Sequence, residues 1–370
     1  MKKIFLFEDD DSERAQISNA LKKVFRRKAT IIEFPANQSV ETTGTLESRV
    51  ASNIAQDRVD IGMIICDQDL SSYIEYQGLS GLSAEVVTTV AREYGIPIAI
   101  YGRGESDLIA DKIRQKRGFL DRRFFLELGI RGDMQKFAKS SLGFFEGCRR
   151  ISDYIEKKLF SNEHSECVYS NPAAILADIL GRPEIETRLR LYSSGDQQYL
   201  ESLLFINSKD DPQMASKAIS CEISYWLWES ILRFPGLLLN EIAASSFLNI
   251  DVNQFNKEKV RALFKKALYK GPFGEIRNYW WRDDLEELLV KNDCEDGYAL
   301  AKKSGLRGLR TCRCSVDGSE KAGYYCMLTD SPVGYKNSVG KIPYFPAGAD
   351  LSRISKSSFY KIAPWAGIEI

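Results

Sequence analysis

The chain has 370 residues, of which 44% are hydrophobic and 11% aromatic, so it is long enough for two or three domains with hydrophobic cores. Its 51 lysines and arginines balance its 51 aspartates and glutamates, so the overall charge points to neither nucleic acid nor acidic lipid. Eight dispersed cysteines form no disulfide framework, and no run approaches the roughly 18 apolar residues of a membrane helix, so we expect a cytoplasmic protein without a membrane segment.

The first third of the chain alternates short apolar runs with amphipathic segments. The apolar, β-branched runs predict strands near residues 3–8, 29–34, 60–66 and 96–101. Apolar residues at three- and four-residue spacing predict helices near residues 12–25, 44–56, 79–94 and 105–116. This alternation is typical of a parallel sheet with helices on both faces. We therefore predict an α/β fold that begins with a doubly wound parallel sheet, of which these segments supply four βα units.

Acidic residues follow two of these predicted strands at their carboxyl ends. Four of them, beginning with Glu8 and Asp9, follow the run 4–7, and Asp67 follows the run 61–66. Ligands collect outside the carboxyl ends of parallel strands, and hard carboxylate oxygens are the ligands that Mg²⁺ prefers. The pattern predicts a magnesium site formed by Glu8, Asp9 and Asp67. The alternative is that these residues are only solvated turns and helix caps.

Residues 1–125 resemble the receiver domain of two-component response regulators. The resemblance is carried by the acidic Glu8–Asp10 after the first strand, by Arg14, by Ile64–Asp67 closing the third strand, and by the later segments 78–85 and 96–101. It implies a (βα)5 domain of five βα units in which Asp67 is the phosphoacceptor and Glu8 and Asp9 help to hold Mg²⁺. It also implies a histidine kinase or a small phosphodonor as the source of the phosphoryl group.

Two positions depart from the family pattern. Receivers place a Thr or Ser at the end of the fourth strand, where this chain has Gly102 followed by Arg103. They also place a lysine after the fifth strand, for which the best counterpart is Arg122. Arginine is a permanent cation that binds phosphate well, so Arg103 and Arg122 are candidate phosphoryl contacts. Gly102 is a third candidate, because it occupies the position of the family's hydroxyl. The alternative is a pseudo-receiver that only presents a surface.

The remaining two thirds of the chain change character twice. We predict a receiver-like domain over 1–130, a connector helix and hinge over 131–165, a helical domain over 166–290 and a mixed α/β part over 291–370, separate from the helical domain or joined to it. Within these parts, helical periodicity predicts helices over residues 131–160, 215–233, 237–247 and 255–269. The single histidine, His164, lies in the polar hinge and is expected to be a surface residue.

One side of the predicted helix 255–269 is basic. It carries Lys257, Lys259, Arg261, Lys265, Lys266 and Lys270. A helix, a short turn and a basic helix are typical of a helix-turn-helix module that binds DNA. The alternative is a surface helix with a solvated lysine face. Farther along, Arg307 and Arg310 lie in a glycine-containing basic stretch with tyrosines nearby, which favours phosphate or single-stranded nucleic acid.

Other motifs limit the structure and function that we expect for the C-terminal output region. Residues 312–314 and 323–328 predict a β-hairpin. The four cysteines Cys294, Cys312, Cys314 and Cys326 lack the paired C-x₂-C spacing of zinc sites, so we expect no zinc. No Walker, G-x-S-x-G or H-E-x-x-H motif occurs, so no enzymatic output is predicted.

These observations predict a response-regulator-like signalling protein. Its receiver-like domain would control a C-terminal output region that binds DNA or RNA. One alternative is an adaptor or phosphate-accepting interaction module without nucleic-acid binding, and another is a nuclease-type effector whose carboxylate site leaves no motif. The sequence leaves homodimerisation open.

Overall fold

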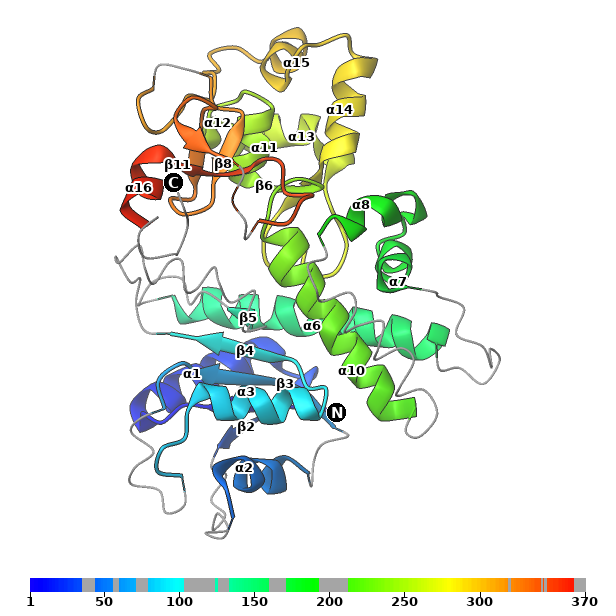
Figure 1. Ribbon diagram of the computed structural model, residues 1–370, viewed down its shortest axis with the longest axis vertical. Coiled ribbons are helices and arrows are strands. Elements are labelled where there is room, and N and C mark those ends of the chain that lie inside the picture. The colour runs from blue at the N-terminus through cyan, green and yellow to red at the C-terminus, as the bar shows by residue number, and fades with distance from the viewer. Residues whose placement is uncertain are drawn as a thin grey trace. The chain divides into compact units, whose positions relative to one another are not determined.

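The computed structural model describes residues 1–34, 44–55, 60–70, 79–102, 124–125, 133–159, 171–192, 212–318, 321–340, 342 and 345–362 (Figure 1). The contacts between residues divide the chain into two units. The described parts of residues 1–105, 120–179 and 196–225 form the first unit, and the described parts of residues 180–195 and 226–370 belong to the second.

A five-stranded parallel sheet forms the core of the first unit. Its strands are β1 (Lys2–Phe7), β2 (Ala29–Phe34), β3 (Ile61–Asp67), β4 (Ile98–Tyr101) and β5 (Phe124–Phe125), in the order β2-β1-β3-β4-β5. The runs 4–7 and 63–67 are buried at every residue, because helices cover both faces of a doubly wound sheet. The prediction of an N-terminal doubly wound parallel sheet is confirmed, and this strand order is compatible with a receiver fold.

Helices connect the strands of this sheet. They are α1 (Asp11–Phe25), α2 (Leu46–Ala55) and α3 (Ala84–Glu93), while the helix predicted near 105–116 lies outside the described residues. Asp10 caps the amino end of α1, because its side chain accepts hydrogen bonds from the backbone N–H groups of Ser12 and Glu13. The helix predicted over 131–160 is confirmed as α6 (Met134–Leu159), which packs against α1.

The described part of the first unit also contains the helices α7 (Pro172–Ile179) and α10 (Pro212–Tyr225). α10 packs against α6 and α3, and an ion pair of 3.6 Å between Arg92 Nη2 and Glu222 Oε1 joins it to α3. The helix predicted over 215–233 is α-helical to Tyr225 and continues as the π-helix η3 (Trp226–Leu232) of the second unit. His164 lies outside the described residues.

The second unit is a mixture of short helices and small sheets. Its first elements are η2 (Pro183–Ile185), α8 (Glu186–Arg190), η3, β6 (Leu238–Asn240), α11 (Glu241–Phe247), α12 (Val252–Phe255), α13 (Glu258–Leu263) and η4 (Lys265–Ala267). They are followed by β7 (Tyr279–Trp281), α14 (Arg282–Lys291), α15 (Gly297–Lys303), β8 (Tyr324–Cys326), β9 (Ser331–Val333), β10 (Ser338–Val339), β11 (Ser352–Ser355) and α16 (Lys356–Ile362). β6 pairs with β7, and the C-terminal sheet has the order β10-β11-β8-β9. The predicted helical region and smaller β-containing part are confirmed.

Three local predictions for this unit need correction. The helix predicted over 237–247 begins only at Glu241, because residues 238–240 form β6. The continuous helix predicted over 255–269 is wrong, since α12, α13 and η4 divide it. The hairpin predicted over 312–328 is reduced to an isolated antiparallel bridge between Arg313 and Lys321, because β8 pairs with β9 and β11 instead.

Aromatic packing explains the broken helix. The Phe255 ring lies 5.9 Å from the Phe264 ring and 5.0 Å from the Trp280 ring, and all three side chains are buried. Lys257 is extended, with ψ of 137°, and Leu268 leaves helical geometry to bridge with Trp280. Burial of these large rings is worth several kcal/mol and outweighs a helix propensity that differs by only tenths of a kcal/mol per residue.

Tyr192 ties distant segments of the second unit together. Its hydroxyl accepts a hydrogen bond from Leu237 N and donates one to Gly348 O, each at 2.8 Å. A Cβ atom at Gly236 would lie 2.3 Å from this hydroxyl and 2.0 Å from Gly348 O, so the close approach requires glycine at position 236. We refer to Tyr192, Gly236, Leu237 and Gly348 as the Tyr192 clasp.

Asp296 stabilises the amino end of α15. Its carboxylate accepts hydrogen bonds from Ala299 N at 2.8 Å, Asn249 Nδ2 at 2.8 Å and Lys321 Nζ at 3.3 Å. Burial opposes ionisation of this carboxyl group, but the hydrogen bonds outweigh it and lower its pKa below the ordinary value. The ionised form of Asp296 is therefore the one that stabilises the fold.

We predict that Asp296→Ala lowers the free energy of unfolding of the second unit by about 1–2 kcal/mol near neutral pH, because a helix cap is removed. The folded-state pKa is depressed, so this stabilisation is present above the unfolded-state pKa and disappears as the pH falls through the folded-state value. The difference between the two proteins should therefore be smaller in acid than near neutral pH.

Urea unfolding followed by tryptophan fluorescence measures this difference, because the tryptophans at 226, 228, 280 and 281 belong to the second unit. The exposed neighbour Glu295 provides a control, since Glu295→Ala should change the free energy by less than about 0.5 kcal/mol. A destabilisation by Asp296→Ala that is equally large at both pH values would contradict the assignment.

Candidate metal centre

The register of three strands places acidic and phenolic side chains in one row. Phe7, the last residue of β1, pairs with Cys66 of β3, and Asp67, the last residue of β3, pairs with Tyr101 at the end of β4. Glu8 follows Phe7 and so continues this register beside Asp67. Glu8, Asp67 and Tyr101 therefore form a row across β1, β3 and β4 at the carboxyl edge of the sheet, where ligands collect.

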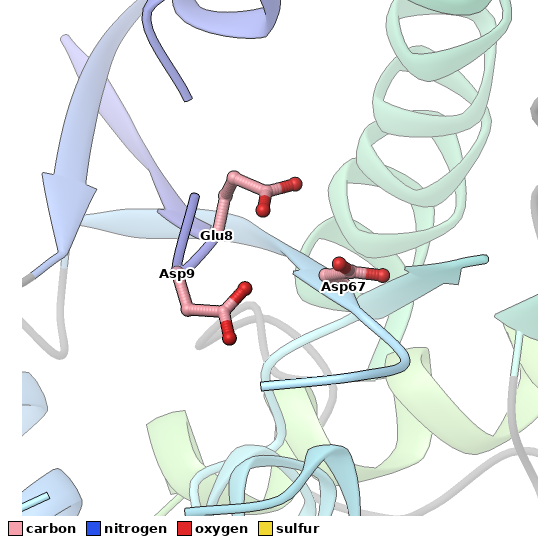
Figure 2. A group of neighbouring side chains, drawn as sticks. All are labelled: Glu8, Asp9 and Asp67. Atoms are coloured by element: carbon pink, nitrogen blue, oxygen red, sulfur yellow. The ribbon is translucent and has the colours of Figure 1, made fainter. Parts of the chain in front are cut away.

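Three carboxylates converge at this edge. Glu8, Asp9 and Asp67 each offer an oxygen, and these oxygens lie within 4.8 Å of one another (Figure 2). Glu8 and Asp67 are fully buried and Asp9 is 8% exposed, so little water screens their mutual repulsion. A hard divalent cation would offset that repulsion, and carboxylate oxygens are suitable ligands for one. The predicted convergence of Glu8, Asp9 and Asp67 is confirmed, and this acidic triad can bind a metal ion.

The Glu8 carboxylate is oriented from both sides. Its Oε2 accepts a hydrogen bond of 2.6 Å from the Tyr101 hydroxyl, and its Oε1 accepts one of 3.1 Å from Asp10 N. Arg14 Nη1 donates to the backbone oxygen of Glu8 at 2.9 Å, and Arg14 Nη2 forms an ion pair with Asp11. Each carboxylate oxygen has a further lone pair, so these contacts fix the carboxylate and still permit it to coordinate an ion.

Tyr101 is a site residue that sequence analysis missed. It is 1% exposed, and burial, followed by the nearby charge of Glu8, raises the pKa of its phenol well above the ordinary value. The hydroxyl is therefore protonated and donates. Its ring packs edge to face against Phe137 of α6 at 5.4 Å. In the sequence Tyr101 reads as the last apolar residue of a strand, and only the strand register shows that it lies in the row of Asp67.

The surroundings of Asp67 are polar and tightly packed. Asp69 N donates to Asp67 Oδ1 at 3.4 Å, and the Cys66 thiol donates to the backbone oxygen of Asp67 at 3.2 Å. Burial raises the pKa of the Cys66 thiol well above the ordinary value, and the charges of Asp67 and Glu8 raise it further. Cys66 is therefore a neutral thiol and not a nucleophile or a thiolate ligand.

Gly102 lies directly after the row, beside Gln68. A Cβ atom at Gly102 would lie 2.8 Å from Gln68 Oε1, and Gln68 N donates to the backbone oxygen of Tyr101 at 2.7 Å. The Gln68 side chain thus takes the space next to position 102. Arg103 and Arg122, the other candidate phosphoryl contacts, lie outside the described residues, and Arg122 precedes β5 in the chain.

Most of the candidate nucleic-acid residues are exposed. These are Lys257, Lys259, Lys265, Lys266, Lys270, Arg307 and Arg310. Arg261 differs, because it is partly buried, forms an ion pair with Glu241 and donates to Asn256 Oδ1 at 2.8 Å. Arg261 therefore has a structural role in addition to any role at the surface.

The structure brings the arginine-containing loop beside α12, the short helix that precedes α13. Gln254, in α12, donates from Nε2 to Gly308 O at 3.1 Å and accepts a hydrogen bond from Arg310 N. Asp251 N donates to Arg310 O at 3.0 Å, and Asp251 also caps α12. α13 follows α12 after two residues, so the loop around Arg310 contacts the helix that leads into the lysines of α13.

The cysteines of the second unit are mostly buried. Cys314 and Cys326 lie in one hydrophobic cluster with Val333 and Ile354, and burial raises the pKa of Cys312 to about 11. Within the part of the chain that the structure describes, the acidic triad is the group of side chains that meets the geometry of a metal site.

Comparisons with known proteins give no relative for this chain, since no family model, no curated protein and no solved structure matches it. Among the described residues, every helix is too short or too polar to span a bilayer. The strand order and the acidic triad are therefore the observations from which a function has to be argued, and both are compatible with a receiver-like domain.

We predict that Asp67→Asn stabilises the metal-free protein and abolishes its response to metal. Removing one of the clustered charges should raise the free energy of unfolding in EDTA by roughly 1 kcal/mol, because like charges this close repel by up to a few kcal/mol. Excess Mg²⁺ should raise the unfolding temperature of the wild type by mass action and leave that of the variant unchanged.

Differential scanning calorimetry with and without Mg²⁺ measures both effects. The matched control is Asp60→Asn, which removes an exposed carboxylate just before the opposite end of β3 and should preserve the response to metal. A metal response that survives in Asp67→Asn would show that the ion does not bind at the triad.

Proposed function

We propose that the first unit is a receiver-like phosphoacceptor domain in which Glu8, Asp9 and Asp67 hold Mg²⁺ and Asp67 accepts a phosphoryl group. The observation that supports this most directly is the convergence of the three carboxylates at the carboxyl edge of β1 and β3. The strand order β2-β1-β3-β4-β5 is compatible with the receiver fold that the sequence resembles. By that resemblance, the donor is a histidine kinase or a small phosphodonor.

The chemistry assigned to these side chains is simple. A carboxylate oxygen of Asp67 forms a bond to phosphorus while the bond from phosphorus to the donor's nitrogen or oxygen breaks, and the donor leaves with that electron pair. Glu8 and Asp9 supply ligands for the cation, and Tyr101 keeps Glu8 oriented. When bound, Mg²⁺ supplies positive charge that offsets the carboxylates and the phosphoryl oxygens.

Phosphorylation would add about −1.5 to −2 charge at the edge of the sheet, and such a charge acts only through new hydrogen bonds. Arg103 and Arg122 are the cations that we propose as its partners, by resemblance to the family's lysine. Gly102 offers a backbone group in place of the family's hydroxyl. Phosphorylation of the first unit is the signal to which the second unit responds.

We predict that beryllium fluoride, a phosphoryl mimic, binds the wild type only in the presence of Mg²⁺ and does not bind Asp67→Asn. The mimic needs both the cation and the carboxylate to which it attaches. Fluorine NMR of the full chain detects the bound species, and Asp60→Asn should behave as the wild type does. Cation binding without any binding of the mimic would favour the pseudo-receiver alternative.

A second proposal concerns the second unit, which we propose binds nucleic acid through its basic side. The observation in its favour is that Gln254 joins the loop carrying Arg307 and Arg310 to α12, which leads into the exposed lysines of α13 and η4. Cations grouped on one side are the usual electrostatic footprint of a phosphate backbone. A helix-turn-helix arrangement is less well supported, because α13 has six residues.

We predict that replacing four exposed lysines of this side by glutamine weakens nucleic-acid binding and reduces its dependence on salt. The four are Lys257, Lys259, Lys265 and Lys266. Removing one lysine–phosphate interaction should lower the slope of log K against log salt by roughly 0.9, while stability changes by less than about 0.5 kcal/mol per residue. Arg261 stays unchanged, because its replacement would break the ion pair with Glu241.

Fluorescence anisotropy with labelled duplex and single-stranded DNA and RNA at several salt concentrations measures these slopes. The control replaces four exposed lysines of α6, Lys136, Lys139, Lys157 and Lys158, with the same change in net charge. An equal decrease in affinity for both variants would indicate a general charge effect. Absence of salt-sensitive binding by the wild type would favour the adaptor alternative, and Mg²⁺-dependent cleavage of the bound strand would favour a nuclease-type effector.

A further inference from the structure

The hydrogen bond between Tyr101 and Glu8 crosses the position of Asp67. Tyr101 ends β4 and Glu8 follows β1, and these two strands are separated in the sheet by β3. Asp67 is the last residue of β3 and the register partner of Tyr101. The phenol therefore reaches across the end of the central strand, beside the carboxylate that we propose as the phosphoacceptor.

A hydroxyl in this position can serve two acceptors in turn. It has one proton to donate, and it donates that proton to Glu8 Oε2 at 2.6 Å. An anion attached to Asp67 brings three oxygens into a site that already holds the carboxylates of Glu8 and Asp9. Such oxygens need donors, because an unpaired buried acceptor is costly and a charged one more so. When a cation takes over the Glu8 carboxylate, the phenol becomes the neighbouring side-chain donor for the anion.

The neighbouring position does not supply this donor. Gly102 has no side chain, and a Cβ atom there would meet Gln68 Oε1 at 2.8 Å. Tyr101 is already in the row of Asp67, is fully enclosed and has its ring held edge to face against Phe137. A phenol fixed in this way loses little conformational entropy when it contacts an anion.

We propose that Tyr101 is an anion-binding residue of this site, whose hydroxyl orients Glu8 in the anion-free state and donates to a phosphoryl-like anion bound at Asp67. The inference rests on the proposed function of the triad and names a residue that neither the sequence pattern nor the resemblance assigned.

The test uses the full chain with Mn²⁺ and beryllium fluoride as probes. Electron paramagnetic resonance measures the affinity for Mn²⁺ alone, and fluorine NMR measures the affinity for the mimic at saturating Mg²⁺. In Tyr101→Phe, which keeps the ring and removes only the hydroxyl, affinity for the mimic should fall by about tenfold or more, as expected when a hydrogen bond to a charged group is removed. Affinity for Mn²⁺ should change far less.

Two further variants make the result specific. Tyr94→Phe removes a phenolic hydroxyl at the end of α3, outside the triad, and should match the wild type. Adding Gly102→Ser to Tyr101→Phe returns a hydroxyl to the edge of the sheet, where the exposed Gln68 side chain can move aside, and should restore part of the affinity for the mimic. The rescue supports the inference only if Gly102→Ser raises the affinity for the mimic less in the wild type, where the Tyr101 hydroxyl is already present.

Three outcomes would overturn the inference. Unchanged affinity for the mimic in Tyr101→Phe would show that the hydroxyl does not contact the anion. An equal decrease in affinity for Mn²⁺ and for the mimic would show that it acts only through Glu8. Absence of mimic binding by the wild type itself would overturn the proposed function together with the inference, and the wild-type measurement alone distinguishes that case from the other two.

Discussion

The parallel register of β1, β3 and β4 is the constraint on which the first unit depends. It brings Glu8 and Asp67, separated by 59 positions in the sequence, to the same edge of the sheet, with Tyr101 completing the row. Clustered buried carboxylates oppose folding, so the hydrophobic residues of the same strands must hold them together. Ile4–Phe7 and Met63–Cys66 are buried on both faces of the sheet and supply that stabilisation. The carboxylate cluster thus destabilises the fold locally, and the hydrophobic core of the sheet compensates for it.

The sequence contained enough information for the sheet and for the triad. Strands buried on both faces are continuous apolar runs, which is why the strand expected at 29–34 is found as β2 with the same bounds. Glu8, Asp9 and Asp67 were predictable because each follows such a run. Tyr101 was not, because an aromatic residue at the end of an apolar strand carries no sign of the residue opposite it. The register between strands is a long-range property, and a single sequence does not state it.

In the second unit, long-range packing overrides the local sequence pattern. Helical spacing over 255–269 suggested one helix, whereas Phe255, Phe264 and Trp280 are buried against one another and the backbone bends to allow it. The elements of this unit are mostly three to seven residues long, so propensity has little length over which to accumulate. The basic residues were visible in the sequence, but the contact of Gln254 with the loop at Gly308 and Arg310 was not.

The Tyr192 clasp bears on the order in which the protein is made. The tyrosine and its acceptor at Gly348 are 156 positions apart, and α10 of the first unit is synthesised between them. The β1–β4 part of the sheet is complete early, and domains generally fold as they emerge from the ribosome. The second unit cannot close its clasp until synthesis has passed Gly348, so until then the hydroxyl of Tyr192 is solvated and its ring lacks its folded packing. The segment between Tyr192 and Gly348 therefore has to stay unfolded or partly folded for longer than the β1–β4 part of the sheet.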